Sequence, residues 1–296
     1  MRPVTRSFGI GVLAAALLAG CSAEETQPTP APKSVTQAGV LTFATFARIL
    51  DDDTKVAEGL NLDGLVSTNG DEASCGMKDF TSPDGEAGID NQFGGLLPVI
   101  EGYVGSENIG ALLAAAIANG QLLILFAIDD VDDLKNDDDV TVRVAAGTGV
   151  PFLDAQGKFI TYQTFGIDRV TAPVSKLPGR IEDGVLHVGP GQAILPVRVL
   201  DAKFNLDLHE VAGRIELTPD ESGGGVSMKG MLAGGIKVVD FKDIIASLDI
   251  GQDVIASATG LIGLLADLVP DEETGKCTQV SAGLRVETTP AFILDE

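Results

Sequence analysis

Apolar and polar residues alternate with a period of two over many short segments of this chain. The alternation is clearest at residues 140–144 and 204–208, and it is the pattern of strands that are buried on one face. The same pattern predicts further strands at residues 158–165, 185–188, 193–200, 213–218, 226–232 and 235–239. Gly, Pro or Asp clusters separate most of these segments, which is typical of turns between strands. The chain is therefore predicted to be mainly β, as an antiparallel β-sandwich or a barrel-like domain.

Four other segments lack this alternation. Residues 122–128 are continuously apolar, which indicates a strand buried on both faces. Residues 109–117, 241–248 and 254–269 repeat their apolar positions with a helical period. The last of these segments contains Asp267 and is shorter than the roughly 20 residues that cross a bilayer. We expect a few helices that cover an edge or an open end of the sheet.

The first 21 residues follow a third pattern. Arg2 and Arg6 precede an apolar stretch that is too short to span a membrane, as in a cleavable export signal. The stretch ends in Leu18-Ala19-Gly20-Cys21, which resembles the lipobox of bacterial lipoproteins. The resemblance implies that residues 1–20 are a signal peptide and that Cys21 becomes the lipidated N-terminus. An ordinary secretory signal followed by an unrelated cysteine is the alternative.

Residues 22–37 are rich in Pro, Thr and Glu and contain almost no large apolar residue. We expect residues 21–38 to comprise the lipidated cysteine and a disordered linker, followed by a single β-rich domain at residues 39–296. In bacterial lipoproteins a residue other than Asp after the cysteine directs the protein to the outer membrane. Ser22 therefore implies, by the same resemblance, a lipid anchor in the outer membrane of the cell envelope, on its periplasmic or surface face.

The charge of the chain limits its partners. The formal net charge is −23, and removal of the signal peptide with its two arginines lowers the charge to −25. Such an acidic protein repels nucleic acid and anionic lipid. We therefore expect no nucleic-acid partner, and contact with the membrane only through the anchor. The sequence does not identify a protein or small-molecule partner.

The chain contains three cysteines, of which lipid is expected to occupy Cys21. Cys75 and Cys277 then remain as one pair in an oxidising compartment, and we predict a disulfide between them. Two separate buried thiols are the alternative.

The segment from Leu62 to Ile100 is the most distinctive part of the mature chain. It contains L-D-G at residues 62–64, C-G at 75–76 and D-G-E-A-G-I-D-N-Q at 84–92, followed by an apolar run. This order of motifs resembles a group of exported bacterial lipoproteins. The resemblance implies a family relationship and no mechanism.

The same segment contains several oxygen ligands of the kind that calcium prefers. The candidate ligands are Asp63, Asp79, Asp84, Glu86, Asp90 and Asn91. The alternative is a metal-free loop in which Asp and Asn side chains bind their own backbone. Residues 129–139 contain seven aspartates. We interpret them as a solvated hairpin loop, with a calcium site as the alternative.

Known catalytic motifs are missing from the sequence, including G-x-S-x-G, H-E-x-x-H and a phosphate-binding loop. The two histidines, His187 and His209, both fall in alternating segments, and the mature chain has few nitrogen or sulfur ligands for zinc. We therefore expect no catalytic residues and a non-catalytic binding or structural role, with calcium as the only candidate cofactor. The alternatives are a lipid-anchored hydrolase with a non-standard carboxylate site, and a carrier of an apolar ligand in a cup of strands closed by helix 254–269.

Overall fold

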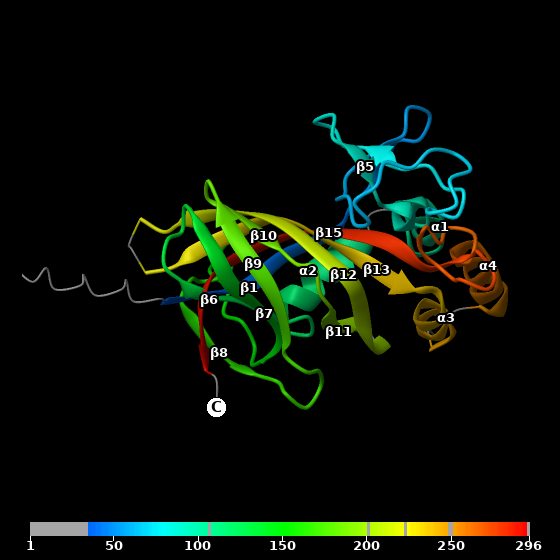
Figure 1. Ribbon diagram of the computed structural model, residues 1–296. Helices are drawn as coiled ribbons and strands as arrows, with labels where there is room; N and C mark the ends of the chain where they lie inside the picture. Colours follow the sequence, from blue (N-terminus) through cyan, green and yellow to red (C-terminus); the bar gives the residue numbers. More distant parts are fainter. Residues whose placement is uncertain (1–34, 106–107, 200–201, 222–223, 248–250, 295–296) are drawn as a thin grey trace, which may run out of the picture. The chain divides into compact units, whose positions relative to one another are not determined.

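The computed structural model describes residues 35–105, 108–199, 202–221, 224–247 and 251–294 (Figure 1). Its strands are β1 (Val35–Phe46), β2 (Ile49–Asp51), β3 (Val56–Ala57), β4 (Phe80–Thr81), β5 (Ala87–Ile89), β6 (Ile124–Val131), β7 (Asp137–Thr148), β8 (Gln163–Ile167), β9 (Ser175–Glu182), β10 (Val185–Val188), β11 (Ala193–Val199), β12 (Ala202–Pro219), β13 (Val226–Lys237), β14 (Leu268–Pro270) and β15 (Cys277–Leu294). The helices are η1 (Gln92–Gly95, a 3₁₀ turn), α1 (Leu97–Val104), α2 (Asn108–Ala118), α3 (Val238–Ser247) and α4 (Gln252–Ile262).

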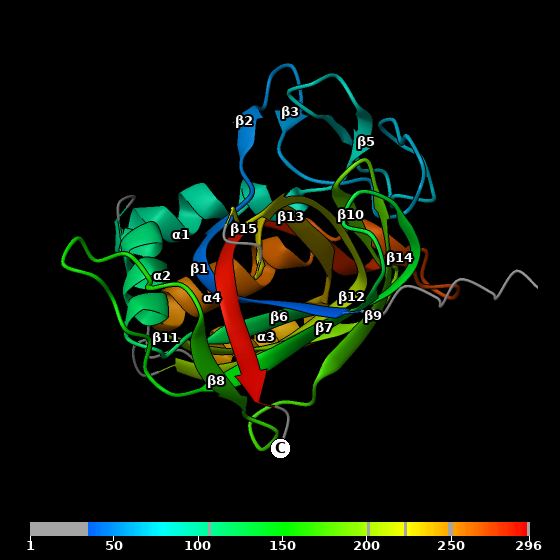
Figure 2. The same ribbon diagram turned by 90° about the vertical axis from the view of Figure 1, so that its left-hand side faces the viewer.

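Within these residues, eight strands close into an antiparallel β-barrel. The strands follow one another in the order β1-β6-β7-β9-β10-β12-β13-β15, and β15 pairs with β1 to complete the ring. Figure 2 looks into this ring. Closure removes the free edges at which an open sheet pairs with other chains. The predicted mainly β, barrel-like antiparallel domain is confirmed.

Strand β6 is buried on both faces, as its continuous apolar run predicts. Ile124 and Phe126 belong to the core inside the barrel. Leu123 and Leu125 belong to a separate outer cluster, where Phe165 of β8 packs against them. The outer cluster forms because β8 pairs with the last residues of β15 and lies over the outside of the barrel.

Strand β12 is one long strand at the place where the sequence predicts two. Its pairing with β13 shifts between His209 and Ala212, and Glu210 has a positive φ of 49°. This β-bulge inserts one residue, so Leu206 and Leu208 face the interior before it and Val211 after it. The bulge thus keeps both halves of the strand apolar on the same side, although the sequence alternation changes phase.

Two other predicted elements differ from the structure. Residues 226–232 and 235–237 belong to the single strand β13, whereas Val238 and Val239, predicted as the end of a strand, begin helix α3. The predicted helix 254–269 ends at Ile262, where Gly263 forms the C-cap. Its remainder includes β14, which pairs with β15. The burial of Asp267 against Ser281 draws this segment onto the barrel.

The folded part begins earlier than predicted. β1 starts at Val35 and pairs with both β6 and β15, so residues 35–38 belong to the sheet and the assignment of linker up to residue 38 is wrong for them. The predicted signal peptide, Cys21 and the rest of the linker lie outside the described residues. Among the described helices, none is long and apolar enough to cross a membrane.

The helices gather around one end of the barrel, as expected of covering helices (Figures 1 and 2). α2 packs on β1, and α3 follows β13 directly and contacts β12, β13 and β15. A loop-rich region, residues 49–91, extends from the end of β1 and contains the short sheet β2-β3-β4-β5. We call this segment the loop region below.

Candidate functional site

The barrel contains an apolar cavity at its helix-covered end. The cavity has a volume of about 190 Å³, and all of its lining residues are apolar. They come from barrel strands, from β11, from η1 and from helices α2 and α3. Phe46, Phe93 and Phe241 line it as an aromatic series, with ring centroids 4.9 Å and 5.5 Å apart.

The β11–β12 hairpin and α2 form the most open part of this lining. Leu113 on α2, Leu195 and Val197 on β11 and Phe204 on β12 are only half-buried, whereas most of the lining on the barrel strands is buried. Apolar side chains therefore continue from the interior of the barrel to the surface along this hairpin. An apolar group entering there would exchange water for apolar contacts along its whole path.

The six residues predicted to bind calcium fall into two groups of three. Asp79, Asp90 and Asn91 are buried, and each is bound to backbone. Asp79 accepts a hydrogen bond from the Ser67 N–H, and Asp90 accepts one of 2.7 Å from the Leu62 N–H.

Asn91 caps η1 by accepting from the Gly94 N–H, and it donates to the backbone carbonyl of Glu58. Asp63, Asp84 and Glu86 are exposed. Among the described residues, no three of the carboxylates in this set bring oxygen atoms within 4.8 Å of one another. The contacts resemble the metal-free alternative, in which the side chains order the loop, and calcium binding stays a prediction.

Burial shifts the acidity of the carboxyl groups beneath the loop region. The pKa of Asp90 is raised to about 8, chiefly by desolvation and also by the nearby charge of Asp267. Desolvation also raises the pKa of Asp267 to about 7, against hydrogen bonds from the Ser281 backbone and hydroxyl. The pKa of Asp79 is raised for the same reason. The folded chain therefore holds protons on these carboxyl groups up to a higher pH than the unfolded chain does.

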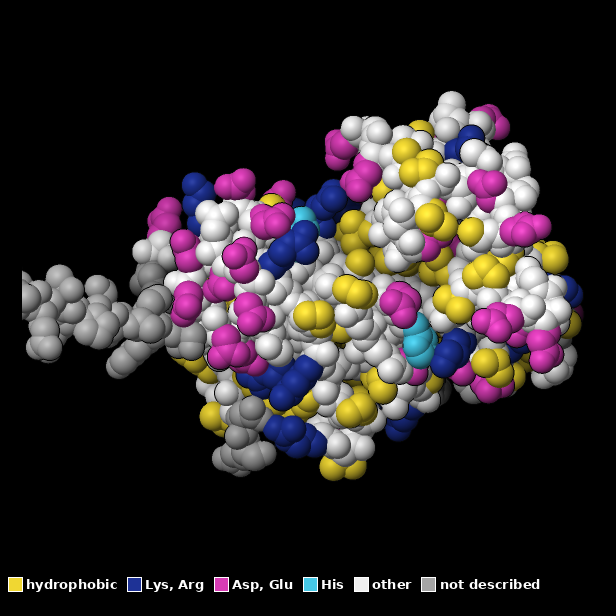
Figure 3. All heavy atoms as spheres, in the orientation of Figure 1, with side chains coloured by type: hydrophobic (Ala, Val, Ile, Leu, Met, Phe, Trp, Pro, Cys, Tyr) yellow, Lys and Arg dark blue, Asp and Glu magenta, His cyan; other side chains and the backbone are white. Residues whose placement is uncertain are grey.

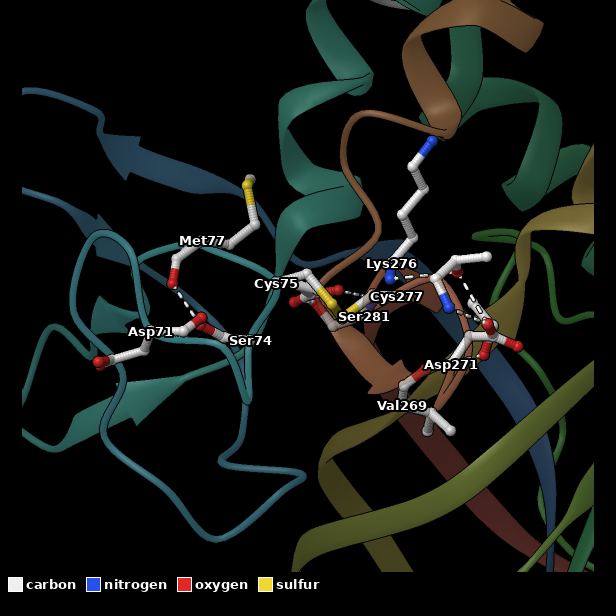
Figure 4. The surroundings of a disulfide bond; sticks show 12 residues. Asp71, Ser74, Cys75, Met77, Val269, Asp271, Lys276, Cys277 and Ser281 are labelled. Atoms are coloured by element: carbon white, nitrogen blue, oxygen red, sulfur yellow. Dashed lines mark hydrogen bonds between the residues drawn. A yellow bond between two sulfur atoms is a disulfide. The ribbon is translucent and has the colours of Figure 1, made fainter.

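The predicted disulfide between Cys75 and Cys277 is present, with Cα atoms 5.7 Å apart. Figure 4 shows how it ties the loop region to the first residue of β15. Next to it, the Ser74 hydroxyl donates a 2.6 Å hydrogen bond to the carbonyl of Met77. The disulfide thus connects two residues that are 202 positions apart in the chain.

Asp84 and Glu86 lie in an open groove of about 370 Å³ between the loop region and strands β12, β13 and β15 (Figure 3). Glu86 forms an ion pair with Arg214 at 2.9 Å. Two further ion pairs in the groove, Arg285–Glu58 and Lys229–Glu287, measure 3.0 and 2.8 Å. These three ion pairs neutralise most of the charge in the groove, and Asp84 and Glu216 are acidic residues of its lining outside these pairs.

The acidic segment 129–139 lies at a hairpin between β6 and β7, as predicted, but the strands run further into it. The connecting residues are only 132–136, and Arg143 pairs with Asp129. Asp137 accepts a hydrogen bond from the Asp132 N–H. A solvated hairpin with local backbone contacts accounts for these aspartates.

One cluster of side chains was missed by the sequence reasoning. Asp207, His209 and Asp240 place one ligand atom each within 4.8 Å of one another, and it is the only such group of metal-ligating side chains in the described part of the chain. Asp240 on α3 is 31 positions from His209 and 33 from Asp207 on β12, so only the Asp207–His209 spacing was visible in the sequence. His187, by contrast, faces a single carboxylate, Glu182, at 3.6 Å.

In comparisons with known proteins, no family model, curated protein or solved structure matches this chain.

Proposed function

We propose that this protein is an envelope lipoprotein that binds an apolar ligand, the alkyl chain of a lipid or a lipid-like molecule, in the cavity of its barrel. The observation that carries the proposal is the 190 Å³ cavity with its entirely apolar lining. The lining offers no side-chain hydrogen bond, so a buried polar group there would lose about 1–3 kcal/mol of hydration without compensation.

The size of the cavity indicates how much of a ligand it holds. An apolar cavity of roughly 150 Å³ holds one benzene ring, whereas pockets for whole drug-sized ligands span roughly 300–1,000 Å³. The cavity of about 190 Å³ therefore fits a segment of an alkyl chain. The half-buried apolar residues of the β11–β12 hairpin lead to it from the surface, and the polar headgroup would remain in water at that mouth.

The lipid anchor supports the same role. The L-A-G-C motif that ends at Cys21 implies a chain held at a membrane surface, where lipid is the most abundant apolar ligand. The acidic charge of the domain keeps the barrel from lying on anionic lipid. A tethered barrel with an apolar cavity is thus able to take up single lipid chains without being embedded itself.

Titration of the purified full chain with a fluorescent polyene fatty acid, such as cis-parinaric acid, tests this proposal. The chain contains no Trp, so the probe fluorescence is free of indole emission. Ala193 is buried in the cavity wall. The substitution Ala193→Leu adds three carbon atoms to this side chain, and these atoms would occupy space in the cavity that the ligand needs. We expect the Kd for the probe to rise at least about tenfold, which corresponds to roughly 1.4 kcal/mol.

The matched control is Ala114→Leu, which makes the same change on the exposed side of α2 and should leave the Kd unchanged. A second variant, Leu195→Asn, places an amide of similar size at the mouth and should weaken binding without filling the cavity. Equal affinities of the wild type, Ala193→Leu and Leu195→Asn for the probe would refute the proposal, provided that circular dichroism shows the variants folded.

A further inference from the structure

The cluster of Asp207, His209 and Asp240 stands on the outer side of the cavity wall. Asp207 and His209 are two positions apart on β12, so their side chains lie on the same face of that strand. Leu206 and Leu208 alternate with them and line the cavity on the other face. Asp240 lies in the first turn of α3, next to Phe241, which also lines the cavity. The cluster therefore bridges two separate elements of the wall.

His209 carries an unsatisfied ring nitrogen. Its Nε2 atom is buried and has no hydrogen-bond partner among the described residues. The nearest carboxylate oxygen, Asp207 Oδ2, is 3.5 Å away and does not have hydrogen-bond geometry. A buried polar atom without a partner destabilises the folded state, and such atoms are rare in folded proteins. The atom points to a partner that binds here.

Asp207 is held in position by a residue outside the cluster. Gln192 donates hydrogen bonds of 2.7 and 2.9 Å to its two carboxylate oxygens. Carboxylate ligands of metal ions are oriented by such outer hydrogen bonds. Because each oxygen has a second lone pair, the hydrogen bonds leave Asp207 able to coordinate a cation.

The three ligand atoms select the type of cation. One imidazole nitrogen with two carboxylate oxygens suits zinc and similar divalent transition metals, whereas calcium takes oxygen ligands only. Two ligands at about 2.1 Å from one ion lie at most about 4.2 Å apart. The three ligand atoms lie within 4.8 Å of one another, so a small side-chain adjustment is enough to reach this geometry. The two aspartates also balance the charge of a divalent ion.

The geometry points to a binding site for a divalent transition-metal ion of the zinc class at Asp207, His209 and Asp240. Side chains of Asp207 and His209 are 29% and 17% exposed, so the ion reaches the site from solvent and water completes its coordination. The bound ion would fasten the N-terminal turn of α3 to β12. It would thereby hold together two elements that line the cavity, whatever the ligand of that cavity is.

Equilibrium dialysis of the full chain, without a histidine tag, against micromolar zinc followed by elemental analysis tests the assignment. We expect one equivalent of zinc for the wild type. His209→Gln and Asp240→Asn should each retain at least about tenfold less. The matched control is His187→Gln, which removes the other histidine of the chain and should retain one equivalent.

Two further readouts make the test specific. Zinc at about a hundred times its Kd should raise the thermal unfolding midpoint of the wild type by about 5–10 °C, and Asp240→Asn should lose this rise. Gln192→Ala should weaken zinc affinity by about tenfold, since it removes only the orienting hydrogen bonds. A wild type that retains no zinc, or a folded His209→Gln or Asp240→Asn that retains as much as the wild type, would overturn the assignment.

Discussion

The barrel and the loop region are stabilised by different physical interactions. The barrel encloses one large apolar core to which nearly every strand contributes. Within the loop region, the separate apolar cluster consists of Ala57, Phe80 and Ile89, with Ile49 packed against it. Such a small cluster buries too little apolar surface to offset the conformational entropy of some forty residues.

Polar and covalent contacts replace the missing core in the loop region. Asp63 accepts from the Leu65 N–H and Asp71 from the Thr68 N–H, so the chain makes turns closed by its own side chains. Asp90 extends this pattern into a buried position, and the Cys75–Cys277 disulfide fastens the region to the barrel. We therefore expect the stability of the loop region to depend on pH and redox conditions, whereas the stability of the barrel depends on the packing of its core.

The largest expected effect comes from the barrel core. Ile128 is fully buried on β6 inside the barrel, and Ile128→Ala should lower the free energy of unfolding by about 4 kcal/mol, through lost burial and a new cavity. Urea unfolding measures this change. As a control, Val170→Ala at a 98% exposed position should change stability by less than about 0.5 kcal/mol. Similar losses at both positions would contradict a barrel held by packing.

The next effect concerns the disulfide. The double variant Cys75→Ser/Cys277→Ser should cost about 3 kcal/mol, because the bond restricts a very long loop of the unfolded chain. Hydrogen exchange measured by mass spectrometry should show faster exchange in residues 49–91 and little change in β6 and β7. Uniform acceleration across the whole barrel would show that the loop region and the barrel unfold as one unit.

A third effect depends on pH. The pKa of Asp90 is about 8 in the folded chain and 3.8 as its ordinary value, so between these values the folded chain holds a proton that the unfolded chain has released. The free energy of unfolding therefore falls as pH rises through this window, by at most about 1.4 kcal/mol per pH unit. Asp90→Asn should remove this loss, because an amide oxygen still accepts from the Leu62 N–H.

Denaturant unfolding of the full chain at pH 5 and pH 8 measures the effect. Asp90→Asn should be more stable than the wild type at pH 8 and closer to it at pH 5, while the control Asp84→Asn, in the same region but exposed, should behave as the wild type. Millimolar calcium in a parallel series tests the predicted calcium site, because a bound cation would stabilise the charged carboxylates. An unchanged pH dependence in Asp90→Asn would contradict the burial argument.

The smallest effect is expected where the two regions meet through exposed charges. Arg214 on β12 and Glu86 of the loop region pair at 2.9 Å with side chains 53% and 42% exposed. Arg214→Gln should cost less than about 1 kcal/mol, because water and salt screen such pairs. Thermal unfolding at low and high salt measures this difference. A loss comparable to that of the disulfide variant would show that charge, rather than the covalent bond, joins the regions.

Local patterns were sufficient to predict much of the barrel wall. Alternation marked residues 140–144 and 204–208, and the continuous apolar run marked β6, because each pattern reports which faces of a single strand are buried. The sequence did not reveal β1, which lies partly in the predicted linker, or β9. The alternation did not delimit β15, because buried small and polar residues such as Ser281 and Gly283 interrupt it.

The sequence by itself was sufficient to predict the class of fold and the cysteine pairing, since these follow from composition, short-range periodicity and residue count. Tertiary structure alone decided the closure of the barrel, the cavity and the meeting of Asp207, His209 and Asp240. The bulge at Glu210 and the pairing of β12 with β13 bring α3 beside β12. Such contacts depend on strand order and register, which no local pattern encodes, because side chains distant in the sequence become neighbours only when the ring of strands closes.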